Sequence, residues 1–215
     1  MKYITTFVRS LMVKLAVVLD RITKGHLKPN HITLISLLGH VLFFLLLVPL
    51  FVSAPSPRVA ALVLVLFGLM DALDGALARV QKSSSIEGMY ADAVSDRLKE
   101  VIVFTALSLL LINHPAYHSQ DAWLAVAALG FSALVSYTKA KGEMAVAGLN
   151  KKTNTQELNR LFGDGFARYE VRMTLVVIAL LFPVLPQMLW VIIVLTAATA
   201  CYRFFTIYRY LKQAT

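Results

Sequence analysis

The chain has 215 residues, 58% of them hydrophobic, and its mean hydropathy is +0.70. This composition excludes an ordinary soluble domain and predicts one integral membrane domain built from several helices. The net charge of +9 suits nucleic acid or an anionic membrane surface, and the hydrophobicity favours the membrane surface, so we expect no nucleic-acid partner. The single cysteine, Cys201, excludes a disulfide framework.

The first 24 residues predict an amphipathic helix. Apolar residues recur at helical spacing, with lysines and arginines between them. Such a helix lies on a membrane surface, and the same pattern equally fits a helix packed on its own domain. Gly25 and Pro29 end it. We therefore take residues 1–28 as an N-terminal juxtamembrane helix and residues 29–215 as the membrane-spanning domain.

Apolar segments fill most of the second part. Crossing the hydrocarbon layer takes about 20 residues of helix. We predict an all-α, polytopic fold in which six transmembrane helices follow the surface helix. The expected spans are residues 29–52, 58–80, 88–112, 122–137 and 167–182, and a last one that runs from the turn at Pro183 and Pro186 to about residue 208.

The distribution of positive charge predicts the orientation of these spans. If both termini face the cytoplasm, only Arg58 of the 21 Lys and Arg residues falls on the outer side. The positive-inside rule therefore places both termini, the end of the second span and a polar loop over residues 139–166 in the cytoplasm. We expect an integral protein of the plasma or inner membrane.

Acidic residues interrupt the apolar pattern where the second span ends and the third begins. The first group lies at helical positions i, i+3, i+4, i+7 and i+8, which form one stripe: Asp71, Asp74, Gly75, Ala78 and Arg79. A second group, with members four residues apart, shares a face of the next helix: Gly88, Asp92 and Asp96. The two helices would therefore direct four carboxylates to one place.

Four carboxylates at membrane depth repel one another, so either some stay protonated or cations bind to them. Oxygen ligands select hard ions such as Mg²⁺ or Mn²⁺, and two such ions can clamp a phosphoryl group. Gly75 and Ala78 leave room for a bulky ligand beside the acids. Arg79 adds a fixed positive charge that suits a phosphate.

The complete spacing, D-x2-D-G-x2-A-R-x8-G-x3-D-x3-D, resembles the signature of the CDP-alcohol phosphotransferases. The resemblance covers essentially residues 29–210 and implies an enzyme that moves a substituted phosphoryl group from a CDP-linked lipid to an alcohol, releasing CMP. It implies that Asp71, Asp74 and Asp92 hold two Mg²⁺ or Mn²⁺ ions. Asp96 would share one ion and act as the general base for the acceptor hydroxyl. Similar enzymes are typically homodimers, so we expect a homodimer.

The same resemblance implies contacts to the donor. The family often carries a segment similar to P-N-x-x-T where the cytidine is held, although Asn30 and Thr33 alone would favour a helix cap. A hydroxyl six residues after the arginine corresponds to Ser85. The donor-binding set implied in this way is Asn30, Thr33, Asp71, Gly75, Ala78, Arg79, Ser85 and Gly88.

Two further pairs indicate an acceptor site. Ser136 and Lys139 are three residues apart, and Arg168 and Arg172 are four apart, all at the cytoplasmic boundary. They could form a cationic pocket, or could anchor the protein to anionic lipid. The segment S-Y-x-K-A is similar to one in the phosphatidylinositol-phosphate synthase branch, where a matching Ser and Lys hold the acceptor's phosphate. The resemblance therefore implies a phosphorylated polyol, with inositol phosphate first.

Other functions stay open at this point. Within the same family, the alternatives are phosphatidylglycerophosphate and phosphatidylserine synthases. An alternative of another class is a divalent-cation transporter or binding protein with an acidic intramembrane site. Arg79 argues against transport, because a fixed cation opposes the passage of a metal ion.

Overall fold

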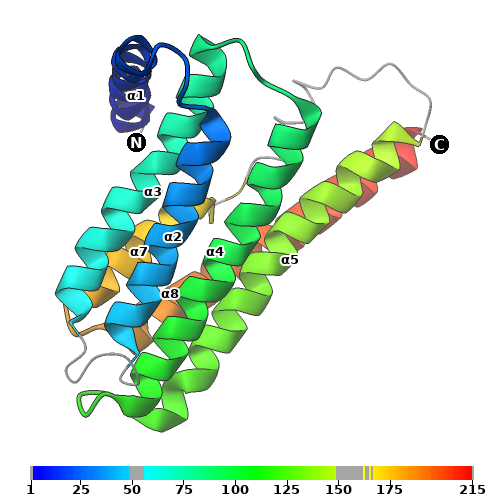
Figure 1. The fold of residues 1–215 in the computed structure, drawn as a ribbon. Helices are drawn as coiled ribbons and strands as arrows, with labels where there is room; N and C mark the ends of the chain where they lie inside the picture. The colour runs from blue at the N-terminus through cyan, green and yellow to red at the C-terminus, as the bar shows by residue number, and fades with distance from the viewer. Residues whose placement is uncertain (1, 49–55, 149–161, 163–164, 166, 215) are drawn as a thin grey trace. The chain divides into compact units, whose positions relative to one another are not determined.

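The computed structural model describes residues 2–48, 56–148, 162, 165 and 167–214. Every regular element among them is helical, as the composition predicts (Figure 1). The elements are α1 (Lys2–Thr23), α2 (Pro29–Leu47), α3 (Pro57–Val80), α4 (Ile86–Asn113), the short 3₁₀ helix η1 (Ser119–Asp121), α5 (Ala122–Ala147), α7 (Tyr169–Leu181) and α8 (Leu185–Ala214).

The chain forms two compact units, residues 1–106 and 107–215, and α4 runs from the first into the second. In the first unit, α1 and α2 both pack against α3 (Figure 1). Their shared core joins side chains of all three helices: Met12, Ala16, Ile32, Ala76 and Leu77. Because α2 meets the last turns of α3 in this core, the start of α2 lies beside the end of α3.

A Schellman motif ends α3 and turns the chain sharply. Lys82 adopts a left-handed conformation with φ of 49°, and the Ser83 N–H donates to the Ala78 carbonyl at 2.9 Å. Just before this turn, the Gln81 side chain donates to Asp20 Oδ1 at 2.7 Å and to the Leu27 carbonyl at 2.8 Å. Gln81 thereby ties the connection between α1 and α2 to the end of α3.

In the second unit, α5 and α7 pack against α8. The helices α5 and α8 are in close contact at Gly142, where an added Cβ would lie 2.7 Å from Ile207 Cδ1. A Trp123–Trp190 contact joins the same two helices at the other end, with ring centroids 5.2 Å apart. The contact between α5 and α8 therefore involves a glycine near one end and an aromatic pair near the other.

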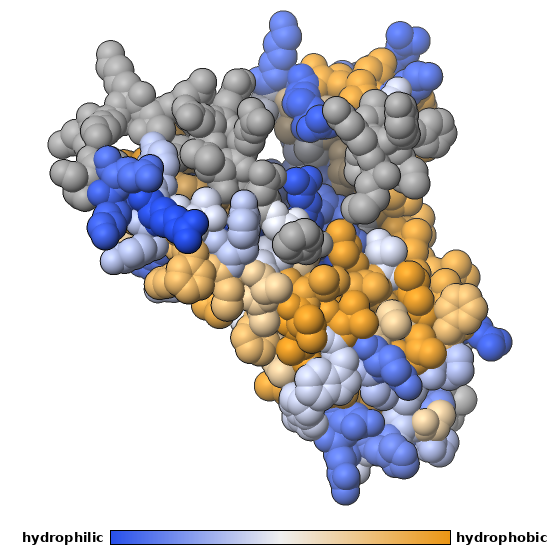
Figure 2. Space-filling model, turned by 180° about the vertical axis from the view of Figure 1, so that it is seen from behind, coloured by the Kyte–Doolittle hydropathy of each residue, from blue (hydrophilic) through white to orange (hydrophobic). Residues whose placement is uncertain are grey.

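Four stretches among the described residues are long and apolar enough to cross a membrane: Pro29–Leu47, Pro57–Val80, Ser119–Ala147 and Leu185–Gln213. The helix α4 differs because its first half carries several charges, and α7 has only 13 residues. Many large apolar side chains on the four stretches face outward, and Figure 2 shows broad apolar areas on the visible surface. Such exposure suits contact with lipid.

Three predicted boundaries were wrong. The polar loop expected from residue 139 is helical up to Ala147, because Lys139 and Glu143 pair at i, i+4 and no proline interrupts the helix. The last helix continues to Ala214, beyond the predicted residue 208. The first span was expected to continue to residue 52, but α2 ends at Leu47 and Val48 is its extended C-cap. Residues 49–52 and most of the predicted polar loop lie outside the described residues.

Candidate functional site

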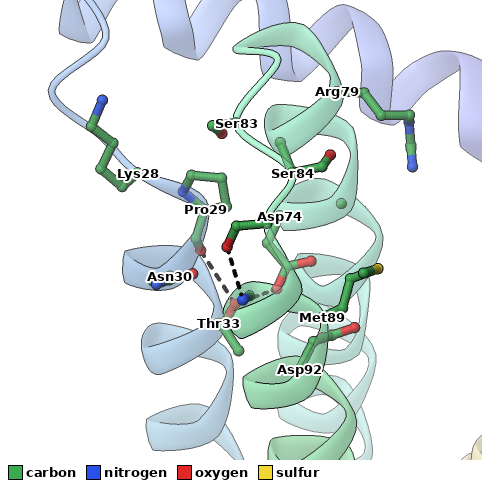
Figure 3. Close-up of a pocket in the computed structure, with 14 residues that line it drawn as sticks. Lys28, Pro29, Asn30, Thr33, Asp74, Arg79, Ser83, Ser84, Met89 and Asp92 are labelled. Atoms are coloured by element: carbon green, nitrogen blue, oxygen red, sulfur yellow. Dashed lines mark hydrogen bonds between the residues drawn. The ribbon is translucent and has the colours of Figure 1, made fainter.

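A pocket of about 360 Å³ lies in the first unit, where α2 begins, α3 ends and α4 begins (Figure 3). Its lining comes from two stretches that are distant in sequence, residues 28–33 and 74–92: Lys28, Pro29, Asn30, Thr33, Asp74, Gly75, Ala78, Arg79, Ser83, Ser84, Ser85, Gly88, Met89 and Asp92. Seven of the eight predicted donor-binding residues are in this set, and Asp71 is the exception. Two of the predicted metal ligands, Asp74 and Asp92, also line the pocket.

A hydrogen bond between α2 and α3 positions one of these acids. Thr33 Oγ1 lies 2.6 Å from Asp74 Oδ2 and 3.2 Å from the Pro29 carbonyl (Figure 3). Asp74 is only 5% exposed, so this bond replaces part of its hydration. The residue at the N-cap of α2 is Lys28, so Asn30 lies inside the first turn and is not the cap.

Two glycines let other groups approach the pocket wall. A Cβ added at Gly75 would lie 3.7 Å from Arg79 Nη1, so the guanidinium lies over the backbone of Gly75. The Gly88 N–H donates to Ser85 Oγ at 3.0 Å, which caps the first turn of α4. Ser85 therefore stabilises a helix start as well as lining the pocket.

The other two acids are joined by a lysine. Lys99 Nζ lies 2.5 Å from Asp71 Oδ1 and 3.5 Å from Asp96 Oδ1, and the Lys99 side chain is fully buried. Ser36 Oγ lies 2.7 Å from the same oxygen of Asp71. The four carboxylates thus form two pairs: Asp74 and Asp92 line the pocket, and Asp71 and Asp96 share an ammonium group.

The contacts of these acids bear on whether the site fits a divalent cation. Within the described part of the chain, no three His, Cys, Asp or Glu side chains lie together as ready-made metal ligands. However, Asp71 Oδ2 is buried and has no hydrogen-bond partner among the described residues. A buried carboxylate oxygen without a donor is costly, and a cation would satisfy it. With only carboxylate oxygens on offer, the donor set suits Mg²⁺ or Mn²⁺.

Sequence reasoning missed several residues of the site. Lys28, Ser83, Ser84 and Met89 line the pocket without any signal in the sequence beyond their proximity to the motif. Lys99 did leave a signal. It follows Asp96 by three residues, shortly before a long apolar run, and a charge at such depth needs a partner.

The predicted acceptor residues all belong to the second unit. Arg172 is buried and donates to the Ala167 carbonyl at 2.7 Å, whereas Arg168 is exposed at the N-cap of α7. Lys139 pairs with Glu143 at 3.6 Å, and Ser136 is half-buried on α5. Although Arg168 and Arg172 are four residues apart, Arg172 is buried and Arg168 is exposed.

Another buried arginine, Arg203 of α8, donates to the Val135 carbonyl at 2.8 Å, directly beside Ser136. In the sequence, Arg203 lies inside the last predicted span, where no motif indicates a role for it. Its position shows that α8, as well as α5 and α7, brings a cation to this unit.

The fold and the pocket define a helical membrane protein with an acidic site, of which Asp74 is buried, at the pocket. Residues 26–202 match the model of the CDP-alcohol phosphatidyltransferase family, and the chain belongs to that family. The match covers α2 to most of α8 and leaves out the whole of α1.

Curated relatives resemble part of the chain. A protein of unassigned function from Aquifex aeolicus is 36% identical over 134 residues, which are 59% of this chain and 61% of the relative. The phosphatidylinositol phosphate synthase of Cutibacterium acnes is 31% identical over 58% of each chain. That of Corynebacterium glutamicum is 33% identical over 63% of this chain and 56% of its own. The matches therefore span somewhat more than half the length of these relatives.

Solved structures show the same fold. The Mycobacterium tuberculosis phosphatidylinositol phosphate synthase with CDP-DAG bound superposes with a TM-score of 0.72 at 24% identity, over 93% of this chain and 94% of that one. The same enzyme in complex with manganese and citrate gives a TM-score of 0.70, over 92% and 88% of the two chains. At this identity the likeness concerns the fold alone.

Proposed function

We propose that this protein transfers a phosphatidyl group from a CDP-linked lipid, of the CDP-diacylglycerol type, to an alcohol and releases CMP. The observation that carries the proposal is the pocket, around which seven predicted donor residues gather with Asp74 and Asp92. Family membership supports it, as does the CDP-DAG bound to the structural neighbour from M. tuberculosis.

Four residues of the pocket have a stated role toward the donor in this proposal. Asn30 and Thr33 contact the cytidine, and Thr33 also orients Asp74 through its 2.6 Å hydrogen bond. Gly75, which has no side chain, lets the donor approach the backbone. The guanidinium of Arg79 neutralises a phosphate oxygen of the donor.

Asp71, Asp74 and Asp92, with Asp96 sharing, would hold two Mg²⁺ or Mn²⁺ ions. When bound, these ions supply positive charge to the donor diphosphate and to the departing CMP. The manganese in the neighbouring structure supports a divalent ion of this kind, and so does the unpartnered Asp71 Oδ2.

The transfer step needs one proton acceptor. Asp96 takes the proton of the acceptor hydroxyl, and the hydroxyl oxygen forms a bond to the phosphorus of the phosphatidyl group. The bond from that phosphorus to the CMP oxygen breaks, and CMP leaves with the electron pair. Burial of Lys99 beside Asp96 helps to hold this carboxylate in place.

For the acceptor we propose a phosphorylated polyol, inositol phosphate first, held by Ser136, Lys139, Arg168 and Arg172. Two relatives named phosphatidylinositol phosphate synthase support this choice. Glycerol 3-phosphate and serine, the acceptors of phosphatidylglycerophosphate and phosphatidylserine synthases, are the alternatives within the family. A divalent-cation transporter is the alternative of another class, and such a protein would release no CMP.

We also propose six transmembrane helices, with α4 and α7 crossing beside the four stretches described above, and α1 lying on the membrane surface. Residues 1–28 and 29–215 are then the surface helix and the catalytic domain. Both termini and the active site face the cytoplasm, and the protein is a homodimer in the plasma or inner membrane. The concentration of Lys and Arg on one side supports this topology.

The experiment that tests the function uses purified full-length protein, CDP-diacylglycerol, Mg²⁺ and a panel of acceptors. CMP release is the readout, and the panel holds inositol phosphate, inositol, glycerol 3-phosphate and serine. We expect release with inositol phosphate in preference to the others. Absence of CMP release with every acceptor, from protein that binds Mn²⁺, would favour the transporter or binding protein.

A further inference from the structure

Lys99 is a cation built into the acidic site. Its side chain is fully buried, and its ammonium lies 2.5 Å from Asp71 Oδ1 and 3.5 Å from Asp96 Oδ1. These two acids come from α3 and α4, so the lysine joins the two helices of the predicted metal site. A buried ammonium is stable only when it is paired, and here both partners are proposed metal ligands.

The contacts of Asp71 divide its two oxygens. Oδ1 accepts hydrogen bonds from Lys99 and Ser36, whereas Oδ2 is buried without a partner among the described residues. A divalent ion that binds Oδ2 and reaches Asp96 would come close to the ammonium. Two cations on the same carboxylates repel, because little water screens them there. The ion must therefore displace Lys99 or bind weakly beside it.

We propose, on the basis of the function proposed above, that Lys99 competes with one of the two divalent ions. The ammonium takes the place of a cation on Asp71 and Asp96 in the metal-free protein, balances their charge and weakens ion binding there. Asp74 and Asp92 line the pocket, and the ion pairs of Lys99 in the described part of the chain are with Asp71 and Asp96, so an ion on the pocket side meets less competition. The two ions therefore bind with unequal affinity.

The competition has a consequence for donor binding. A donor diphosphate in the pocket adds negative charge beside the acids, which offsets the repulsion between Lys99 and the second ion. The weaker ion and the donor therefore strengthen each other's binding, since coupling between two ligands is reciprocal. The weaker ion is then held firmly only when the donor diphosphate is bound beside it.

The test measures Mn²⁺ binding to the detergent-solubilised full chain without lipid, from the electron paramagnetic resonance signal of free Mn²⁺. We expect one tighter and one weaker site in the wild type. Lys99→Met, which removes the ammonium, should tighten the weaker site about tenfold or more. Lys14→Met removes an exposed charge from α1 and should change neither site.

A second variant distinguishes the loss of the charge from misfolding. Lys99→Gln keeps a hydrogen-bond donor for Asp71 but no charge, and it should also tighten the weaker site. Thermal unfolding gives an independent readout: without metal both variants should melt lower than wild type, and Mn²⁺ should raise their melting temperature more than that of wild type. A lysine that only supports the fold would instead give weaker or unchanged Mn²⁺ binding in both variants.

The outcomes separate this inference from the function it rests on. Equal or weaker Mn²⁺ binding in both variants, from wild-type protein that binds Mn²⁺ and releases CMP, overturns the role of Lys99 and leaves the function intact. Wild-type protein that binds no Mn²⁺ overturns both. Tighter binding in both charge-removing variants, with no change in Lys14→Met, supports the competition.

Discussion

Two single residues of α2, each with a hydroxyl group, form hydrogen bonds with the two acids of α3. Thr33 bonds Asp74 at 2.6 Å and Ser36 bonds Asp71 at 2.7 Å. Thr33 and Ser36 lie three residues apart on one helix, and so do Asp71 and Asp74 on the next. Two helices with matched spacing therefore align two hydrogen bonds, which fixes the direction of each carboxylate.

Removal of any one anionic ligand should abolish turnover. Asp71→Asn, Asp74→Asn and Asp92→Asn each replace a hard anionic oxygen with a neutral amide, which binds Mg²⁺ poorly. CMP release should fall to background in each variant. EDTA should stop the wild type, and added Mg²⁺ or Mn²⁺ should restore it. Full turnover by EDTA-treated Asp92→Asn protein would contradict the metal mechanism.

Arg79→Ala should weaken use of the CDP-linked donor while the fold survives. A charge-assisted phosphate contact contributes about 1.5–3 kcal/mol, so kcat/KM for the donor should fall roughly ten- to a hundredfold. Arg9→Ala, at an exposed position of α1 outside the pocket, is the matched control. Unchanged donor kinetics in Arg79→Ala would remove this residue from the site.

Among the helices, the close contact between α2 and α3 determines the geometry of the site. A Cβ added at Gly39 of α2 would overlap the ring of Phe67 on α3, so only glycine permits this approach. Ser36 bonds the Phe67 carbonyl at 2.9 Å one turn earlier. The distance between these helices thus decides whether Thr33 and Ser36 can reach the acids.

Gly39→Ala should therefore lower the melting temperature and the CMP release rate together. Overpacking of a close helix contact costs about 1–3 kcal/mol. Gly68→Ala is the same substitution on α3 at a position where nothing lies within 4 Å of the added Cβ. It should leave stability unchanged or raise it slightly, because alanine favours helix. Equal effects of the two substitutions would show that the α2–α3 approach tolerates a methyl group.

The two units of the molecule differ in the charged residues that each of them buries. Acids and Lys99 are buried in the first unit, whereas the second unit buries Arg172 and Arg203 against backbone carbonyls. Removal of a buried arginine that donates to a carbonyl destabilises the fold, so such an arginine has a structural role in addition to any role in ligand binding. The exposed Arg168 and the partly exposed Lys139 are the better probes of acceptor binding.

Lys139→Ala and Arg168→Ala should raise the acceptor KM and leave the donor KM nearly unchanged. An acceptor phosphate gains from several cations at once, and a neutral alcohol does not. Wild-type protein should likewise prefer inositol phosphate to free inositol. If these cations only anchor the protein to lipid, both variants should insert less well while the inserted enzyme keeps wild-type kinetics.

The helical class, the membrane environment and the residues of the signature could all be predicted from the amino-acid sequence. Apolar composition and helical spacing are local properties, and they place Asp71, Asp74, Asp92 and Asp96 on two helix faces without any tertiary information. Helix ends were less predictable: α5 continues through polar residues because the Lys139–Glu143 pair stabilises a turn that hydropathy assigns to a loop.

The division of the four acids into two pairs depends on the packing of the helices and could not be predicted from the sequence. Asp74 and Asp92 line the pocket, whereas Asp71 and Asp96 face Lys99, and spacing along one helix cannot specify which oxygen meets which partner. That choice depends on the approach of α2, α3 and α4, which packing sets across distances of many residues. A buried charge must find its partner in space, and the partner of Asp71 lies 28 residues away along the chain.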